Sequence, residues 1–411
     1  MLPPPGRAGT MSGLRDAPTP PWIIIAIVIA LAQVVTRSLA VPGAQPTDPG
    51  EDFQAYSVRY HNCLFKCDQD GCAYVAHRGE VFEAGGCVPS CARNGAALEG
   101  AHPPEFSLPM RLAGWTCASD CKFRCMQSTM ALRAVEGLRP AKYYGKWSFH
   151  RVLGTQEIIS SLASVANAAV HVRYLPELLR VSLDRNRPEP ARHRARLWLV
   201  NALVNINGWT WSAVFHARDT PRTHFMDYAS ANAIFFFALF AVLVRVWGRR
   251  GRRLRWPLAA AFCLWWAAHV REMNVPSDGL KYQYERNMRV MMGVAVAHWS
   301  LLLLWAFPRA WGRKSWEPHP GRRALFGNFA CWHVAAVAEV ADFPPLGGLL
   351  DAHALWHCAT VPCVWLWYVF VRSDLREGEG GGAEQTGKGK PAERRVGGRD
   401  KVAPDKRRAR R

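Results

Sequence analysis

The stretch ARLWLVNALVNINGWTWSAVFH, residues 195–216, sets the fold class of this chain. Its 22 residues, at a rise of about 1.5 Å each, are long enough for a helix to cross the ~30 Å hydrocarbon core of a bilayer. Its small and polar residues recur at steps of three or four: Asn201, Asn205, Gly208, Ser212 and His216. Such steps place them on one helix face. The stretch therefore predicts a membrane-crossing helix with one polar stripe.

Six further apolar stretches have similar lengths. They cover about residues 156–172, 225–247, 254–270, 290–308, 324–342 and 349–371. Each is about long enough to cross a bilayer as a helix, which is one of the two structures that satisfy the backbone there. We therefore predict an all-α membrane protein, a seven-transmembrane helix bundle over residues 151–372, with an N-terminal disulfide-rich lumenal segment.

The charges of the connecting loops predict the orientation of the bundle. The loops at residues 173–196, 245–255 and 309–323 hold 18 Lys and Arg in total, whereas those at residues 217–224, 271–289 and 342–352 hold 6. Cytosolic loops carry the excess of basic residues. The alternation therefore predicts a cytosolic C-terminus, and an odd number of spans then leaves the N-terminal segment in the lumen.

The composition of the whole chain is misleading without this division. Its 411 residues carry a formal charge of +20, which first suggests a nucleic-acid partner. However, 18 Trp and 18 Phe gathered in apolar runs suit a bilayer better. The mean hydropathy of −0.10 averages segments of opposite character. We predict no nucleic-acid partner, and a basic, disordered cytosolic tail over residues 373–411.

Residues 1–40 have the organisation of a signal peptide. Arg7 and Arg15 precede an apolar core of 14 residues that starts at Trp22, and Ser38-Leu39-Ala40 offers a small-residue cleavage site. The alternative is an uncleaved anchor helix, although the core is short for the ~20 residues of a span. In both cases the following segment is delivered to the secretory lumen.

That following segment, residues 41–150, is rich in cysteine. It holds eight of the twelve cysteines: Cys63, Cys67, Cys72, Cys87, Cys91, Cys117, Cys121 and Cys125. An even number behind a signal peptide indicates disulfide bridges. Zinc is the alternative, because Cys63-x3-Cys67 and Cys117-x3-Cys121 have ligand spacing. We expect bridges, with the pairing left open, and a structural role.

Ionisable residues in membrane helices are costly, so they are the first candidates for a functional site. His353 and His357 lie one turn apart at the start of the last stretch, and Ser212 and His216 end the stretch quoted above. Asp227 begins the next stretch, eleven residues after His216. With the predicted orientation, all five residues lie at the same lumenal depth on three helices. We therefore predict one site there.

Three imidazoles with an open fourth position are typical of catalytic zinc. We predict that His216, His353 and His357 bind zinc, and that Asp227 takes a proton from the attacking water and later delivers it to the leaving group. Ser212 is predicted to hydrogen-bond the water or the oxyanion. The alternatives are interhelical hydrogen bonds for the histidines, a packing hydroxyl for Ser212 and a helix-start carboxylate for Asp227.

Other acidic residues have two interpretations each. Glu339 and Asp342 either orient the ligand histidines or pair with Arg218 or Arg222. Glu157 begins a further inward stripe, which we interpret as packing or as a secondary cation site; it continues with Ser160, Ser164 and Asn167.

Several short motifs follow one another between residues 60 and 365. They are Cys63-x3-Cys67-x4-Cys72, Leu112-Ala-Gly-Trp-Thr-Cys117-x3-Cys121-x3-Cys125, Gly145-Lys-Trp147, Gln156-Glu157, Asn207-x3-Trp211-Ser212-x2-Phe215-His216-x-Arg218-Asp219-Thr220, Met226-Asp227-Tyr228, Asp342-Phe-Pro-Pro345 and Leu350-Asp351-Ala-His353-Ala-x-Trp356-His357. This order resembles the Per1-like family, within the CREST group of seven-helix membrane hydrolases that also includes alkaline ceramidases and progestin/adiponectin-type receptors. The metal pattern of that group is Ser-x3-His, a carboxylate eleven residues later and a late His-x3-His, and this chain matches it at Ser212, His216, Asp227, His353 and His357.

The resemblance implies a specific activity in the ER or Golgi membrane. Its substrate would be the lipid of GPI-anchored proteins, from which a phospholipase A2-like, zinc-dependent hydrolysis removes the sn-2 acyl chain. One alternative is a ceramidase-like amide hydrolase, although the cysteine-rich segment favours a protein-linked substrate. Another is a non-enzymatic seven-helix receptor with a structural metal. The chain departs from the family in Cys87 and Cys91, its long N-terminus and its arginine-rich tail.

Overall fold

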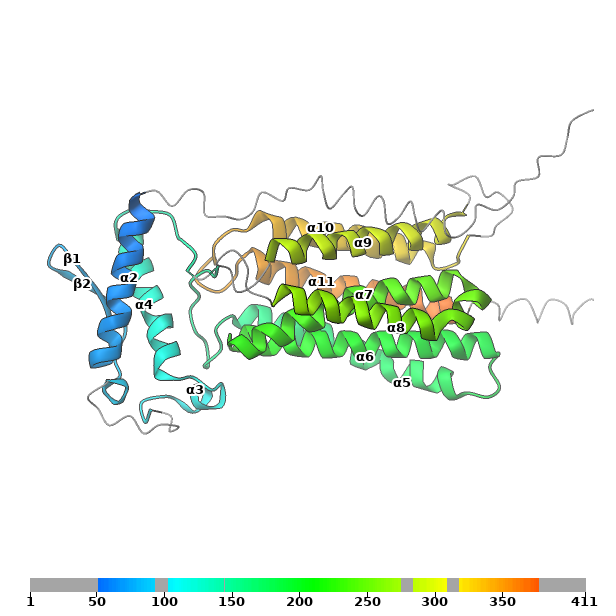
Figure 1. Cartoon of the computed structure of the whole chain (residues 1–411), viewed down its shortest axis with the longest axis horizontal. Helices are drawn as coiled ribbons and strands as arrows, with labels where there is room; N and C mark the ends of the chain where they lie inside the picture. The colour runs from blue at the N-terminus through cyan, green and yellow to red at the C-terminus, as the bar shows by residue number, and fades with distance from the viewer. Residues whose placement is uncertain (1–50, 93–102, 144, 275–283, 309–317, 377–411) are drawn as a thin grey trace, which may run out of the picture. The chain divides into compact units, whose positions relative to one another are not determined.

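The computed structural model describes residues 51–92, 103–143, 145–274, 284–308 and 318–376. The predicted signal peptide lies outside these residues, as does the predicted tail beyond residue 376. The described chain forms a cysteine-rich region, here defined as residues 51–143, followed by a bundle of long helices (Figure 1).

The cysteine-rich region combines helices with one hairpin. Its elements are α2 (Glu51–Asp70), β1 (Cys72–His77), β2 (Glu80–Cys87), the 3-10 helix η1 (Pro89–Cys91), α3 (Leu108–Leu112) and α4 (Cys117–Val135). Strands β1 and β2 pair antiparallel, and α2 and α4 both pack against β1. Thr116 caps α4, because its hydroxyl accepts a hydrogen bond from the backbone N–H of Ser119.

Four disulfides cross-link this region, which confirms the predicted bridges. Two of them join α2 to α4 one helical turn apart, one closes the hairpin and one ties η1 to the start of α4: Cys63–Cys125, Cys67–Cys121, Cys72–Cys87 and Cys91–Cys117. All eight cysteines are therefore bonded to one another, and the zinc alternative for this region is wrong.

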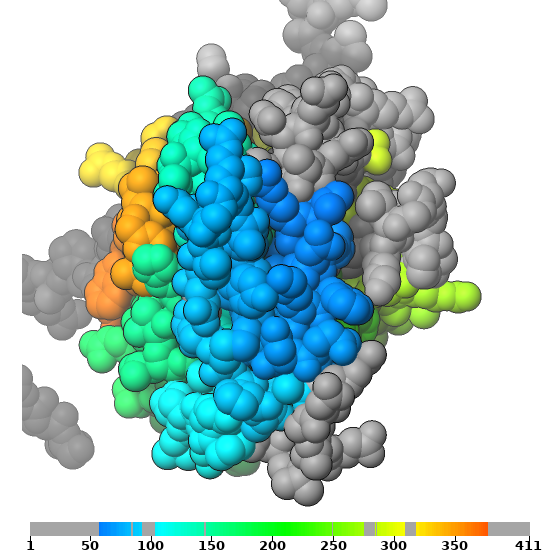
Figure 2. All heavy atoms as spheres, turned by 90° about the vertical axis from the view of Figure 1, so that its left-hand side faces the viewer, coloured from blue at the N-terminus to red at the C-terminus, as the bar shows by residue number. Residues whose placement is uncertain are grey.

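A small apolar core fills the space between α2, α4 and the hairpin. It contains Tyr60, Val75, Leu132 and Tyr143 around the two α2–α4 bridges. The tilted rings of Tyr60 and Tyr143 pack with centroids 4.8 Å apart, so the chain after α4 is held against α2. Figure 2 shows the outer face of the region as a continuous surface of blue and cyan atoms.

Seven long helices follow among the described residues, one at each predicted span. They are α5 (Ile158–Leu183), α6 (Glu189–Ala217), α7 (Pro221–Val246), α8 (Gly248–Met273), α9 (Tyr284–Ala306), α10 (Arg322–Ala341) and α11 (Ala352–Arg376). Their axes run roughly parallel to one another (Figure 1). The basic segment 173–196, predicted as a loop, is mostly helical, because α5 and α6 extend into it. Its Arg and Leu residues are good helix formers, so a high content of arginine does not end a helix.

Four of these helices are long and apolar enough to cross a membrane. They comprise α7, residues Arg286–Ala306 of α9, α10 and α11. The other three are interrupted by polar or charged residues: α8 opens with an arginine-rich turn, α6 carries the asparagine stripe, and α5 carries Arg173, Glu177 and Arg180 in its second half. The chain is thus a helical membrane protein with N-terminal disulfides.

Close contacts hold α6 against its neighbours. A Cβ on Gly208 would lie 2.4 Å from Cδ1 of Ile234 on α7, so the missing side chain lets the two helices approach closely. Near the other end of α6, the Nε1–H of Trp198 donates to Asp374 Oδ2 at 2.7 Å. Asp374 is fully buried on α11, which continues to Arg376, four residues into the segment predicted as tail.

Candidate metal centre

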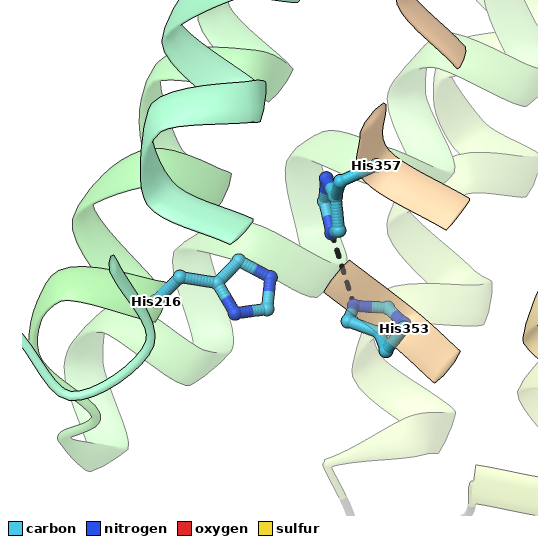
Figure 3. A group of neighbouring side chains, drawn as sticks. All are labelled: His216, His353 and His357. Atoms are coloured by element: carbon cyan, nitrogen blue, oxygen red, sulfur yellow. Dashed lines mark hydrogen bonds between the residues drawn. The ribbon is translucent and has the colours of Figure 1, made fainter. Parts of the chain in front are cut away.

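Three histidines converge where the end of α6 meets the start of α11. His216 belongs to the last turn of α6, and His353 and His357 lie one turn apart near the start of α11. One ring nitrogen of each lies within 4.8 Å of the others, and Figure 3 shows the three rings turned toward a common space. The sequence prediction that these three residues come together is thus confirmed.

Each of the three rings has a hydrogen-bonding neighbour at Nδ1. Glu157 Oε2 lies 2.6 Å from Nδ1 of His216, and Glu339 Oε2 lies 2.7 Å from Nδ1 of His353. Ser164 Oγ lies 3.1 Å from Nδ1 of His357. A carboxylate accepts the Nδ1 proton, which leaves the Nε2 lone pair free for a metal.

For His357, the hydroxyl of Ser164 takes the place of the carboxylate. The Ser164 O–H donates to the backbone oxygen of Ser160 at 2.8 Å, so a lone pair of Ser164 faces the Nδ1–H of His357. The Nε2 atoms of His353 and His357 then lie 3.0 Å apart. Two nitrogens bound to one zinc at 2.0–2.1 Å would be about 3.4 Å apart. The donor set and its outer partners therefore fit a divalent metal that prefers imidazole.

Ser212 and Asp227 are placed differently with respect to the rings. Ser212 is buried one turn before His216, and its hydroxyl lies 3.2 Å from Ser164 Oγ. Asp227 is half-buried in the second turn of α7. Among the described residues, however, none of the three histidines donates a hydrogen bond to Asp227. No described hydrogen bond therefore links Asp227 directly to the three rings.

Two tryptophan rings pack against His353 and His357 of α11. Trp356 stacks on His353 with an interplanar angle of 18°, and its ring centroid lies 4.8 Å from that of His357. Trp209, two turns before His216, meets the ring of His357 edge-on at 5.7 Å. These rings exclude water from one side of the histidines and fix their orientation.

A charged network links His216 through Glu157 to Lys146 and Asp219. Lys146 Nζ lies 3.0 Å from Glu157 Oε1 and 3.0 Å from Asp219 Oδ2. Burial disfavours the ammonium of Lys146, but the two carboxylates outweigh it and raise the pKa of Lys146. The lysine therefore remains charged between two acids.

Sequence reasoning left the roles of several of these residues open. Glu157 and Ser164, interpreted as packing or a cation site, contact His216 and His357. Glu339 orients His353, as one alternative stated, but Asp342 does not touch a histidine. Its carboxylate pairs with Lys142 at 2.6 Å and accepts a hydrogen bond from Trp147. Neither Arg218 nor Arg222 is its described partner. The sequence feature that could have pointed to Glu157 is the motif Gln156-Glu157.

The arrangement described above defines a class, namely a helical membrane protein with a buried three-histidine centre. The sequence model of the Per1-like family matches residues 107–375, and the chain belongs to this family. No solved structure is significantly similar to it.

Relatives with curated names cover most of the chain. The GPI-specific phospholipase A2-like PGAP3 of Xenopus tropicalis is 33% identical over 292 residues, which cover 70% of this chain and 87% of that protein. The post-GPI attachment to proteins factor 3 of Drosophila melanogaster is 31% identical over 347 residues, 84% of this chain and 93% of that protein. The PER1 homolog of Schizosaccharomyces pombe is 30% identical over 293 residues, 69% and 83% respectively.

Proposed function

We propose that this chain removes the sn-2 acyl chain from the lipid of GPI-anchored proteins by metal-dependent ester hydrolysis. The observation that carries the proposal is the three-histidine centre, in which every Nδ1 has a hydrogen-bonding neighbour and one ring nitrogen of each histidine lies within 4.8 Å of the others. The names of the relatives, which include GPI-specific phospholipase A2-like proteins, support the choice of substrate. A membrane bundle suits a lipid that reaches the site from the side.

The proposed ligands are His216, His353 and His357, with zinc as the metal. When bound there, zinc supplies Lewis acidity for the ester carbonyl and lowers the pKa of a water molecule. Asp227 accepts a proton from the attacking water and passes it to the leaving alcohol, which releases a fatty acid and a lysolipid. Ser212 exchanges its hydrogen bond with Ser164 for one to the carbonyl oxygen as negative charge develops.

The proposed topology places this chemistry on the lumenal side. Seven helices, α5 to α11, cross the membrane of the ER or Golgi, after a signal peptide at residues 1–40 and a cysteine-rich lumenal segment at residues 41–150. The tail after α11 is cytosolic. Four disulfides support this orientation, because bridges form and persist in an oxidising compartment. The excess of basic residues in alternate loops supports it as well.

The decisive experiment compares two histidine variants in cells that lack the endogenous chain. His357→Ala removes a proposed ligand, whereas His333→Ala removes an exposed histidine of α10 whose described contacts are with the ring and the backbone oxygen of Phe329. Mass spectrometry of GPI lipids should show remodelled acyl chains with wild type and His333→Ala, and none with His357→Ala. Normal acyl composition with His357→Ala, or a purified chain without stoichiometric metal, would exclude the mechanism.

A further inference from the structure

The carboxylate of Glu157 has two partners on opposite sides. One oxygen accepts the Nδ1–H of His216 at 2.6 Å, and the other lies 3.0 Å from the ammonium of Lys146. The side chain of Glu157 is 8% exposed and that of Lys146 27%. The ammonium therefore faces a nearly buried acid at the outer edge of the centre.

The backbone of Glu157 is fixed as firmly as its side chain. Its N–H donates to the backbone oxygen of His216 at 3.0 Å, and the N–H of Gln156 donates to that of Ala217 at 3.0 Å. The residue that caps the start of α5 is thereby tied to the last turn of α6. Lys146 and His216 then hold its carboxylate from both sides.

Lys146 is itself placed by the cysteine-rich region. Two backbone hydrogen bonds join it to Tyr143 and close a tight turn, with N–O distances of 2.9 and 3.0 Å. Gly145 in that turn has φ of +77°, a conformation that other residues adopt at a cost. Tyr143 is 6% exposed and packs on Tyr60 of α2. Contacts therefore run from the disulfide-bonded helices through this turn to His216.

We propose that Lys146 is a positioning residue for the metal centre, which acts on His216 through Glu157, so that the cysteine-rich region forms part of the centre. The inference rests on the proposed function only in that it takes the three histidines as metal ligands. Without the ammonium, Glu157 and Asp219 would be two carboxylates with no cation between them, and they would repel each other. The Glu157 carboxylate would then turn away from His216, whose ring would lose its fixed tautomer.

The test measures zinc affinity of the full chain in detergent by competition with a chelator of known affinity. Lys146→Met should weaken zinc binding about tenfold, and Glu157→Gln by about 10- to 100-fold, the range for partners of ligand histidines. Lys146→Arg should restore most of the affinity, because it keeps the charge. In the double variant, Lys146→Met should add nothing to the loss caused by Glu157→Gln, since Lys146 acts through that residue alone.

A matched control lies in the same segment. Lys142 pairs with Asp342 at 2.6 Å and its ammonium lies over the ring of Trp147. Among the described residues, it forms no hydrogen bond or ion pair with Glu157 or with the three histidines. Lys142→Met therefore removes a lysine that holds the same segment through Asp342 instead of Glu157. It should leave zinc affinity unchanged. Should Lys146→Met fail to fold, Lys146→Gln gives a second variant that keeps a hydrogen-bond donor without the charge.

The possible outcomes separate this inference from the proposed function. Three results would overturn the positioning role. The first is wild-type zinc affinity in both uncharged Lys146 variants, and the second is additive losses of affinity in the double variant. The third is a loss of affinity in Lys142→Met equal to that in Lys146→Met. Stoichiometric zinc and the expected coupling without any lipid hydrolysis would overturn the proposed activity alone. A wild-type chain that binds no zinc would overturn both.

Discussion

Two acids at one helix end have different partners. Glu339, near the end of α10, accepts the Nδ1–H of His353 at 2.7 Å. Asp342, three residues later, has a left-handed backbone with φ of 39°. That turn directs its carboxylate to Lys142 instead. A carboxylate behind a ligand histidine fixes the tautomer and raises the basicity of the ring. Glu339 therefore belongs to the centre, whereas Asp342 docks the segment before α5.

Glu339→Gln should weaken zinc binding on the order of tenfold, because an amide accepts the Nδ1–H without supplying the negative charge. Asp342→Asn is the matched control on the same helix end and should bind zinc like wild type. Chelator competition measures both. Equal affinities in all three proteins would show that His353 needs no carboxylate behind it.

The three histidines could be predicted at this scale, but most of their hydrogen-bonding partners could not. His353 and His357 follow from a spacing of four on a helix, and His216 from its place at the same end of the bundle. The contacts of Glu157 and Ser164 depend on how far α5 is rotated about its axis and where it begins. That rotation is set by packing against α6 and α11, which no local spacing encodes.

The two parallel disulfides between α2 and α4 act as a pair. Cys63 and Cys67 are one turn apart on α2, and they bond to Cys125 and Cys121, one turn apart on α4. With one bridge in place, the other closes only a short loop of a few residues. Loop-closure entropy grows with loop length, though slowly, so the second bridge adds less stability than the first.

Removal of these bridges should therefore be non-additive. Replacing either pair by alanine should cost about 2–3 kcal/mol, whereas replacing both should cost more than twice as much, because the second loss also releases the long loop. Thermal unfolding followed by tryptophan fluorescence measures the effect. Two single losses that sum to the double loss would mean that each bridge stabilises the region independently.

The positions of the long helices were predictable, but their ends were not. Hydropathy located a helix at every predicted span because each segment must bury its apolar face. Residues 173–196 were assigned to a loop from their charge alone. Charge indicates which side of a membrane a segment occupies, but the backbone of α5 and α6 continues through it.

Across the whole bundle, α6 and α11 are joined near both ends. The histidine centre joins them at one end, and Asp374 joins them at the other. About 27 Å of helix separates Trp198 from His216, and about 26 Å separates His357 from Asp374. Asp374 also accepts a hydrogen bond from Arg245 of α7 at 2.8 Å. This fully buried acid thus connects three helices far from the histidines.

Asp374→Asn should destabilise the protein by about 3 kcal/mol or more, because it removes the buried carboxylate charge that pairs with Arg245. Zinc affinity should not change, since the site lies at the other end of the same helices. Glu177→Gln is the control: it breaks an exposed ion pair between α5 and Arg372 of α11 and should cost less than about 1 kcal/mol. Thermal unfolding in detergent distinguishes them, and equal midpoints for Asp374→Asn and wild type would contradict the role of Asp374.

The spread of the histidine centre along the chain sets the order in which it can form during synthesis. Glu157 and His216 leave the ribosome early, Glu339 much later, and His353 and His357 only with the last helix. A nascent or truncated chain that lacks α11 has one of the three histidines and cannot form the centre. Under the proposed function, the chain therefore cannot attack membrane lipid until its last helix has been inserted.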